Sequence, residues 1–240
     1  MSIVRVIPLY KKIASEILKL IRSGHYPTGT LPSEEQLSAS MGVSKHTVRE
    51  ALAELTSLSY ILKRHGIGNI ILDSVLDTQF RIDANMNFMQ LLHRAGYETK
   101  LEQMNFHIQS MAMYGFEKQS YYIYDEIMYA NSHPATQHRI FIPTDLFARN
   151  HPLQDCPGIG LFDLFSNQQM VAHHSIVEIV PELADEHIKE LFHLPESAII
   201  NTWEEIIYDS NDDPICNAKL KFNPNFFPLR MVRKDFEIID

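Results

Sequence analysis

Hydrophobic and polar positions in residues 8–23 alternate with the spacing of an amphipathic helix. Apolar residues recur every three or four positions, and charged residues lie between them. The apolar positions are Leu9, Ile13, Ile17, Leu20 and Ile21. Residues 24–30 contain two glycines and a proline, so this segment predicts the end of the helix and a turn.

A second and a third helix are predicted shortly after this turn. Ser33 is placed to cap the second helix, and Gln36 three residues later completes a capping box. Gly42 supplies the backbone freedom for a tight turn, and Ser44 is placed to cap the third helix. The apolar stripe of the third helix consists of Val48, Ala51, Leu52, Leu55 and Leu58. Two helices joined by a tight glycine turn predict a helix-turn-helix.

The polar positions of the third helix gather near its N-terminus, where a recognition helix presents side chains to base edges and attracts phosphate. They are Lys45, His46, Thr47, Arg49 and Glu50. Residues 60–62 and 69–72 predict two short strands around a basic, glycine-containing hairpin tip, which is typical of a DNA-binding wing. The tip carries Lys63, Arg64, His65 and Gly66. Taken singly, each cation would better suit a solvated surface, and only their order within one motif favours DNA contact.

The second half of the chain predicts a mostly antiparallel sheet with interleaved helices, so the fold class is α+β with two domains. Residues 85–95 form an amphipathic stretch that ends at Gly96. Strands are predicted at 106–113, 121–129, 136–142, 175–180, 199–208, 214–222 and 229–236. Helices are predicted at 144–149, 161–166 and 183–192.

The charge is distributed unevenly between the two halves. The net charge is −9, yet residues 1–72 hold nine Lys and Arg against five Glu, which gives +4 and leaves −13 for the remainder. This asymmetry suggests a basic module joined to an acidic one, in which the basic module contacts a polyanion. We therefore predict domains at 1–72 and 84–240, joined by a linker at 73–83.

Composition excludes several classes of protein. An apolar content of 45% is typical of a soluble globular protein, and the sequence has neither an apolar run of about 20 residues nor the pattern of a secretory signal. Cys156 and Cys216 are too few for a disulfide scaffold or a four-cysteine zinc site, which favours the cytoplasm. The twelve histidines suggest a metal site, but His187 and His193 are six residues apart and face different sides of a helix. We expect no metal and no cofactor.

The N-terminal motifs resemble the DNA-binding domain of the GntR superfamily of bacterial transcription regulators. Four motifs in order carry the resemblance, at residues 8–14, 31–34, 42–52 and 65–68. The resemblance implies that Lys45, Thr47 and Arg49 contact operator DNA and that the wing tip enters the minor groove. The full DNA-binding set predicted is Ser33, Ser44, Lys45, His46, Thr47, Arg49, Lys63, Arg64, His65 and Gly66. The chain departs from the family at Glu35, where an arginine is usual, and at Asn69, where threonine is common. The change at Glu35 leads us to expect that a phosphate contact is missing or reversed and that the operator differs from the usual sequence.

Residues 80–236 resemble the UTRA effector-binding domain of the HutC branch of that superfamily. The motifs are Asn87-Phe88, Arg94-Ala95-Gly96, Phe141-Ile142-Pro143, the helix at 184–194 with the Pro-Glu-Ser that follows it, Tyr208-Asp209 with Pro214, and Ala218-Lys219. The resemblance implies a chorismate-lyase-like fold that binds a small-molecule effector within a homodimer. Residues 84–240 are then the effector-binding and dimerisation domain.

The expected pocket residues differ from those of phosphosugar-binding members. Glu126 and Met128 stand where such members have arginines, so a sugar phosphate bound in the usual way is disfavoured. The predicted effector-binding set is Asn87, Phe88, Met89, Glu126, Met128, His138, Cys216, Lys219 and Phe222. Strand alternation predicts that Glu126, Met128, His138, Cys216 and Phe222 reach one cavity, whereas Arg139 faces away. As an alternative, Met128, Cys216 and Phe222 fill the core.

The combined prediction is a DNA-binding regulator, a repressor, whose affinity for double-stranded operator DNA depends on an effector. No contact with a membrane is expected. An enzyme is the main alternative, but the sequence lacks a nucleophile with a paired base, a glycine-rich phosphate loop and paired carboxylates at a motif spacing. A second alternative is an architectural protein that senses nothing.

Overall fold

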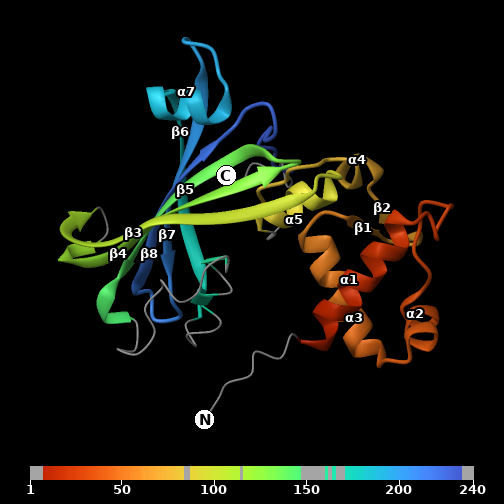
Figure 1. Ribbon diagram of the computed structural model, residues 1–240. Coiled ribbons are helices and arrows are strands. Elements are labelled where there is room, and N and C mark those ends of the chain that lie inside the picture. The colour runs from red at the N-terminus through yellow and green to blue at the C-terminus, as the bar shows by residue number, and fades with distance from the viewer. Residues whose placement is uncertain are drawn as a thin grey trace, which may run out of the picture. The chain divides into compact units, whose positions relative to one another are not determined.

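The computed structural model describes residues 8–83, 87–113, 116–146, 160–161, 164–165 and 171–233. The chain folds as two compact units, an N-terminal unit of Val4–Asn87 with Leu229–Asp240 and a C-terminal unit formed mainly by Phe88–Pro228. Figure 1 labels the elements of both units. None of the helices within these described ranges is long and apolar enough to cross a membrane.

The N-terminal unit contains the predicted three helices and hairpin (Figure 1). Its elements are α1 Leu9–Arg22, α2 Glu34–Met41, α3 Lys45–Ser57, β1 Ile61–Arg64, β2 Gly68–Ile71 and α4 Asp73–Leu76. The winged helix-turn-helix prediction is therefore confirmed. The strands reach further toward the tip than the sequence predicted, because Arg64 pairs with Gly68 and only three residues remain in the turn.

Local hydrogen bonds fix the starts of α2 and α3. The Ser33 hydroxyl accepts a bond from the Gln36 amide at 3.2 Å, and the Gln36 side-chain oxygen accepts one from the Ser33 amide at 2.9 Å. Gly42 ends α2 with φ of 67°, a left-handed conformation that glycine adopts without steric cost. The Ser44 hydroxyl accepts a bond from the Thr47 amide at 3.1 Å. Both predicted caps are confirmed.

One apolar core holds these elements together. Val48, Ala51, Leu52 and Leu55 of α3 are buried and belong to the same cluster as Ile17 of α1. The predicted apolar stripe thus packs inward, which leaves the polar face of α3 at the surface. This packing positions the N-terminus of α3 for an external contact.

The segment predicted as a linker is folded within the N-terminal unit. It contains α4, and Val75 and Phe80 are buried. The amide of Ile82 donates to the carbonyl of Arg230 at 2.9 Å, and the amide of Arg230 donates to the carbonyl of Phe80 at 3.1 Å. The domain boundaries predicted from the sequence nevertheless stay a prediction.

The strand predicted at 229–236 is wrong for its described part. Over residues 229–233 the backbone forms one isolated parallel bridge, between Arg230 and Arg81, and no ladder. The residues around Arg81 do not form a strand. The backbone hydrogen bonding at Arg230 therefore cannot continue into a ladder. Residues 234–236 lie outside the described ranges.

The C-terminal unit is built on a six-stranded antiparallel sheet with strand order β3-β4-β5-β8-β7-β6. The strands are β3 Thr99–Met113, β4 Phe116–Ala130, β5 His133–Pro143, β6 His174–Leu183, β7 Ile199–Tyr208 and β8 Pro214–Phe222. The other elements are α5 Phe88–Arg94, the 3-10 turn η1 Thr144–Leu146 and α7 Glu186–Phe192. This confirms the α+β class and the mostly antiparallel sheet.

Several element boundaries differ from the prediction. The helix predicted at 183–192 starts three residues later, because Leu183 still pairs with Ile199 and Asp185 caps α7. The predicted helix at 144–149 is a 3-10 turn as far as Leu146, and residues 147–149 lie outside the described ranges. Only residues 161, 164 and 165 of the helix predicted at 161–166 are described, and all three are helical.

Candidate DNA-binding and effector-binding sites

The N-terminus of α3 presents a polar surface. Lys45, His46 and Arg49 are exposed, and the start of the helix is held by its cap. The Thr47 hydroxyl lies 2.9 Å from the Ser44 hydroxyl, so these two side chains are hydrogen-bonded to each other. The predicted recognition residues therefore lie together on a rigid helix start.

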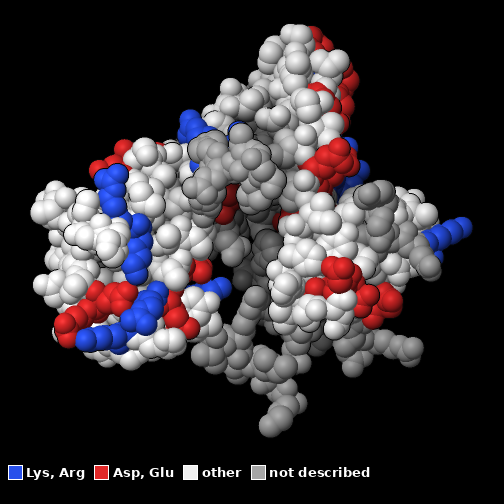
Figure 2. Space-filling model, turned by 180° about the vertical axis from the view of Figure 1, so that it is seen from behind, with Lys and Arg blue, Asp and Glu red and all other residues white. Residues whose placement is uncertain are grey.

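Two carboxylates of α2 lie against the cations of α3. The Lys45 ammonium donates to Glu35 at 2.6 Å, and the Arg49 guanidinium donates to one oxygen of Glu34 at 3.1 and 3.2 Å. The hydrogen bond from Lys45 lowers the pKa of the Glu35 carboxyl. Figure 2 shows blue and red side chains next to each other on the surface. The sequence marked Glu35 as a departure from the family, and the structure gives this residue a partner.

The wing adds further cations beside this surface. Lys63 lies 4.0 Å from Glu34, and Arg64, His65 and Gly66 are exposed. Gly66 has φ of 77°, and a Cβ atom there would meet nothing within 4 Å. The tip therefore requires glycine for its backbone conformation, and space remains for close approach to a ligand.

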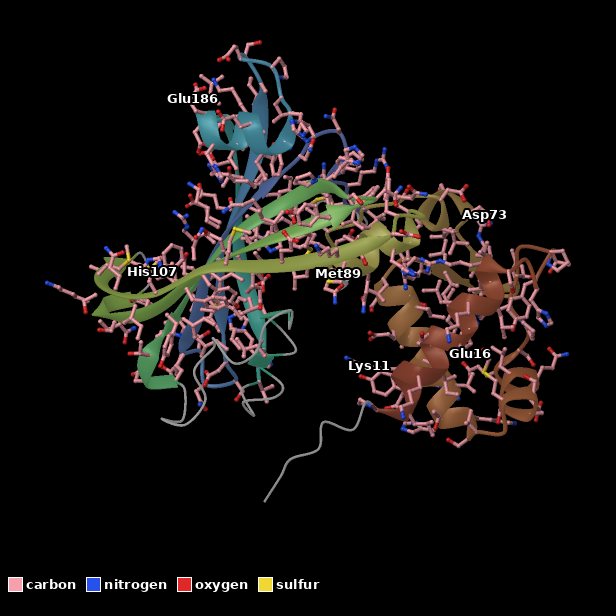
Figure 3. All side chains as sticks on the ribbon, in the orientation of Figure 1. Lys11, Glu16, Asp73, Met89, His107 and Glu186 are labelled. Carbon is pink, nitrogen blue, oxygen red and sulfur yellow. The ribbon has the colours of Figure 1, made fainter. Side chains whose placement is uncertain are left out.

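The second candidate site lies on one face of the C-terminal sheet. The register places Glu126 opposite His138, His138 opposite Leu220 and Leu220 opposite Trp203. Phe88 of α5 covers this face, because its ring lies 5.8 Å from His138, 5.5 Å from Trp203 and 5.1 Å from Phe222. Figure 3 shows the side chains of this unit and labels Met89 on the same helix.

Most of the predicted effector residues share this face. Glu126, Met128, His138, Cys216 and Phe222 alternate on three neighbouring strands with their side chains on one side, as strand periodicity predicted. All five are buried. Their shared position follows from the register, whereas their role in effector binding stays a prediction.

Lys219 does not share this face, and its role in effector binding stays a prediction that the register does not support. It lies between Ala218 and Leu220 in the strand, so its side chain is on the opposite face. There its ammonium contacts Glu204 at 3.0 Å and Glu182 at 3.8 Å. Arg139 also faces that way, as predicted, and its guanidinium donates to Asp125 at 2.8 and 3.0 Å.

The two predicted residues that flank Phe88 lie at the start of α5. Met89 is half-buried, and Asn87 is exposed. Asn87 is the last residue of the first segment of the N-terminal unit, whereas Phe88 and Met89 belong to the C-terminal unit.

Four described side chains on this face have buried polar atoms without a hydrogen-bond partner. They are the Tyr124 hydroxyl, the Thr136 hydroxyl, His138 Nε2 and Trp203 Nε1. Tyr124, Thr136 and Trp203 were missed by the sequence analysis. Strand alternation places Tyr124 and Thr136 two residues before predicted positions, so that signal was available. Placing Trp203 on this face requires the order of the strands in the sheet, which sequence patterns do not supply.

Two carboxyl groups on this face have polar partners. Glu126 accepts a bond from the Gln103 amide at 2.7 Å and lies 3.7 Å from His138 Nδ1. Burial raises the pKa of the Glu205 carboxyl, although its hydrogen bond with Ser175 opposes the shift.

The Cys216 thiol and the Tyr124 phenol both stay protonated near neutral pH. Burial, Glu205 and Glu126 raise the pKa of the Cys216 thiol well above its usual value. Burial and Glu126 do the same for the pKa of Tyr124. A protonated, fully buried thiol is a poor nucleophile. The arrangement suits binding better than cysteine-based catalysis.

The histidines do not assemble into a metal site in the part of the chain that the structure describes. No group of three or more His, Cys, Asp or Glu side chains there could hold a metal ion. His193 instead ends α7 in a left-handed conformation, with φ of 53°.

Comparison with known proteins identifies the N-terminal fold. The family of bacterial regulatory proteins called the gntR family matches residues 9–71. Residues 9–71 form a gntR-family helix-turn-helix domain. The HTH-type transcriptional regulator TreR of Bacillus subtilis is 36% identical over 101 residues, which cover 42% of this chain and 40% of TreR. The histidine utilization repressor of Pseudomonas aeruginosa is 35% identical over 65 residues, which cover 27% of this chain and 26% of the repressor.

The matched segments span less than half the length of either relative. Both names are those of transcriptional regulators. The likeness assigns residues 9–71 to a domain of this kind, and the activity of the whole chain is a matter for proposal.

Solved structures extend the likeness to the whole fold. The crystal structure of YydK from Bacillus subtilis covers 95% of this chain with a TM-score of 0.73 and 16% identity, and all of YydK is covered. The effector domain of PhnF from Mycobacterium smegmatis covers 62% of this chain, with a TM-score of 0.55, 9% identity and 95% of that domain covered. At these low identities the likeness concerns the fold, which this chain shares with YydK and, over 62% of its length, with the effector domain of PhnF.

Proposed function

We propose that this chain is a transcription repressor whose affinity for operator DNA is controlled by a small molecule bound in its C-terminal unit. The observation that carries the proposal is the gntR-family domain, with an exposed polar start of α3 beside a glycine-tipped basic wing. Helix N-termini attract phosphate, and side chains of a recognition helix reach base edges in the major groove. Such a regulator works in the cytoplasm, where bacterial DNA lies.

The proposal includes a homodimer. One recognition helix reads only a few base pairs, so specific affinity needs two copies on a pseudo-palindrome with half-sites about 34 Å apart. The acidic C-terminal unit is poorly suited to DNA, which leaves it free for effector binding and for the contact between subunits.

Effector control requires only a modest coupling energy. A coupling of about 1–3 kcal/mol changes DNA affinity about 5- to 150-fold, and the same factor applies to effector affinity when DNA is bound. The buried unpartnered polar atoms beneath α5 support a ligand site there, because buried polar groups normally have hydrogen-bond partners.

Retention of genomic DNA tests this function. Fragments retained by the purified full chain are sequenced, and enrichment of one motif with two-fold symmetry is expected. Each member of a metabolite library is then tested for a shift in melting temperature and for release of that motif. Retention without any shared motif would contradict a specific regulator. A protein that binds the motif but responds to no metabolite would support the architectural alternative.

A further inference from the structure

The face beneath α5 is rich in hydrogen-bond acceptors. Glu126 is only 1% exposed. Glu205 follows Trp203 by two residues in β7, so its side chain is on the same face of the sheet. The unpartnered Tyr124 and Thr136 hydroxyls can also accept hydrogen bonds, and His138 Nε2 can do so when the ring is neutral. Trp203 Nε1 alone among these groups is limited to donation. A ligand that pairs with this set must therefore supply most of the donors.

In the described strand segments around the site, no Lys or Arg side chain balances these carboxylates on this face, and His138, 3.7 Å from Glu126, carries a positive charge only when it is protonated. The relevant strand segments are residues 124–128, 136–140, 201–207 and 216–222. Every Lys and Arg side chain in these described segments projects from the opposite face of the sheet. Arg139 and Lys219 are paired there with Asp125 and Glu204. An anionic ligand would meet the Glu126 carboxylate in a region of low dielectric, where like charges repel strongly.

Aromatic rings lie against two of these groups, His138 and Trp203. Phe88 lies edge-on to Trp203, with an interplanar angle of 88°, and close to Phe222 and Phe227. Phe222 and Phe227 are 5.5 Å apart. Ring faces attract organic cations, and the attraction increases when the cation is desolvated.

We propose that this face binds a small planar organic cation that carries N–H donors, such as an amidinium, a guanidinium or a protonated heterocycle. The inference rests on the proposed function, because it names the chemical class of the effector. Carboxylates bind the N–H groups, and the aromatic side chains contact the flat surface of the ligand. The same arrangement excludes sugar phosphates and simple carboxylates.

Three probes of one shape and different charge test the inference. Benzamidinium is a cation, benzamide is neutral, and benzoate is an anion. Trp203 is the single tryptophan of the chain, so its fluorescence reports binding on this face in the full-length protein. We expect saturable binding of benzamidinium that is at least about tenfold tighter than that of benzoate, with benzamide between them.

Variants assign the preference to the carboxylate. Glu126→Gln should reduce the ratio of benzamidinium to benzoate affinity at least about fivefold and change benzamide affinity less than about twofold. Glu204→Gln, on the opposite face, removes the same charge and should leave all three affinities unchanged. If circular dichroism shows that Glu126→Gln does not fold, the ratio of benzamidinium to benzoate affinity in the unsubstituted chain is the only test of the inference.

Several results would overturn the inference. They are benzoate binding as tightly as benzamidinium, no saturable response to any probe, or an unchanged preference in folded Glu126→Gln. Gel shifts with enriched duplex DNA on the same preparations separate this outcome from failure of the proposed function. Duplex binding without cation preference overturns only the inference, whereas loss of duplex binding overturns the regulator.

Discussion

The ammonium of Lys45 donates to a carboxylate oxygen of Glu35 at 2.6 Å, so α2 places a negative charge against the first residue of α3. Both side chains are exposed, with 58% and 75% of their surface accessible, and water and salt therefore weaken the pair. On the proposed function, DNA must compete with Glu35 for Lys45 or accept a negative charge near its backbone. We therefore expect the pair to affect DNA affinity more than folding.

Replacing Glu35 with glutamine should strengthen DNA binding. Glu35→Gln frees Lys45 for phosphate, and one additional phosphate contact should steepen the slope of log K against log salt by about 0.9. The measurement is fluorescence anisotropy of labelled duplex over a range of salt concentrations. Glu16→Gln is the control, since Glu16 pairs with Lys19 on α1 and its loss changes net charge equally. Equal effects of both substitutions would show that Glu35 acts only through net charge.

Arg49 and Lys63 should differ in what they contribute to DNA binding. Arg49→Ala should cost about 1–3 kcal/mol on the preferred sequence and relax specificity if Arg49 reads a base. Lys63→Ala should weaken binding to all sequences and reduce the salt slope by about 1. Titrations with specific and scrambled duplexes measure both effects. If both variants bind both duplexes as tightly as the unsubstituted chain, then neither α3 nor the wing contacts DNA through these residues.

Loss of the α3 cap should destabilise the N-terminal unit. Ser44→Ala removes the acceptor for the Thr47 amide and should cost about 1 kcal/mol of unfolding free energy. Chemical denaturation is followed by far-ultraviolet circular dichroism, while Trp203 fluorescence monitors the C-terminal unit. Ser23→Ala at the exposed end of α1 should change stability by less than about 0.5 kcal/mol. A Ser44→Ala effect no larger than that of Ser23→Ala would argue against the cap.

Asp125 should make the stability of the C-terminal unit depend on acid pH. Burial raises its pKa, but the stronger combined effect of bonds from Arg139 and Asn105 lowers the pKa below 3.8. A carboxyl whose pKa is lowered by folding contributes stability above its unfolded pKa of about 3.9, and the contribution is lost as pH falls through the lower folded value. Asp125→Asn should therefore cost about 1 kcal/mol at pH 7 and much less below about pH 3.

Urea denaturation followed by Trp203 fluorescence checks this prediction. Asp213→Asn, in the exposed turn between β7 and β8, provides the matched control and should have little effect at either pH. A cost of Asp125→Asn that is the same at pH 7 and pH 3 would contradict the assigned role of its charge.

The N-terminal unit could be predicted almost completely, because its signals are local. Ser33 with Gln36, Gly42 and Ser44 fix helix ends through bonds to residues within five positions. The wing also forms from neighbouring residues. The pairing of Glu35 with Lys45 was not predicted, because it depends on how α2 packs against α3.

The C-terminal unit could be predicted only in part, because its contacts are distant in sequence. Alternation placed Glu126 and His138 on one face, and the same rule places Lys219 on the opposite face. Trp203 joins the site only because β8 lies between β5 and β7. The segment after Pro228 has strand-like composition, but Arg230 pairs with Arg81, far away in the sequence.

Methylation of operator DNA with dimethyl sulfate tests the central claim most directly, because it modifies guanine N7 in the major groove and adenine N3 in the minor groove. If α3 of each subunit lies in the major groove, the full chain should protect guanine N7 in two symmetric half-sites about 10 base pairs apart. The wings should protect adenine N3 beside each half-site, and Arg49→Ala should remove the guanine protection. A chain that protects no guanine N7, or that is monomeric and binds no duplex at low ionic strength, would contradict this account.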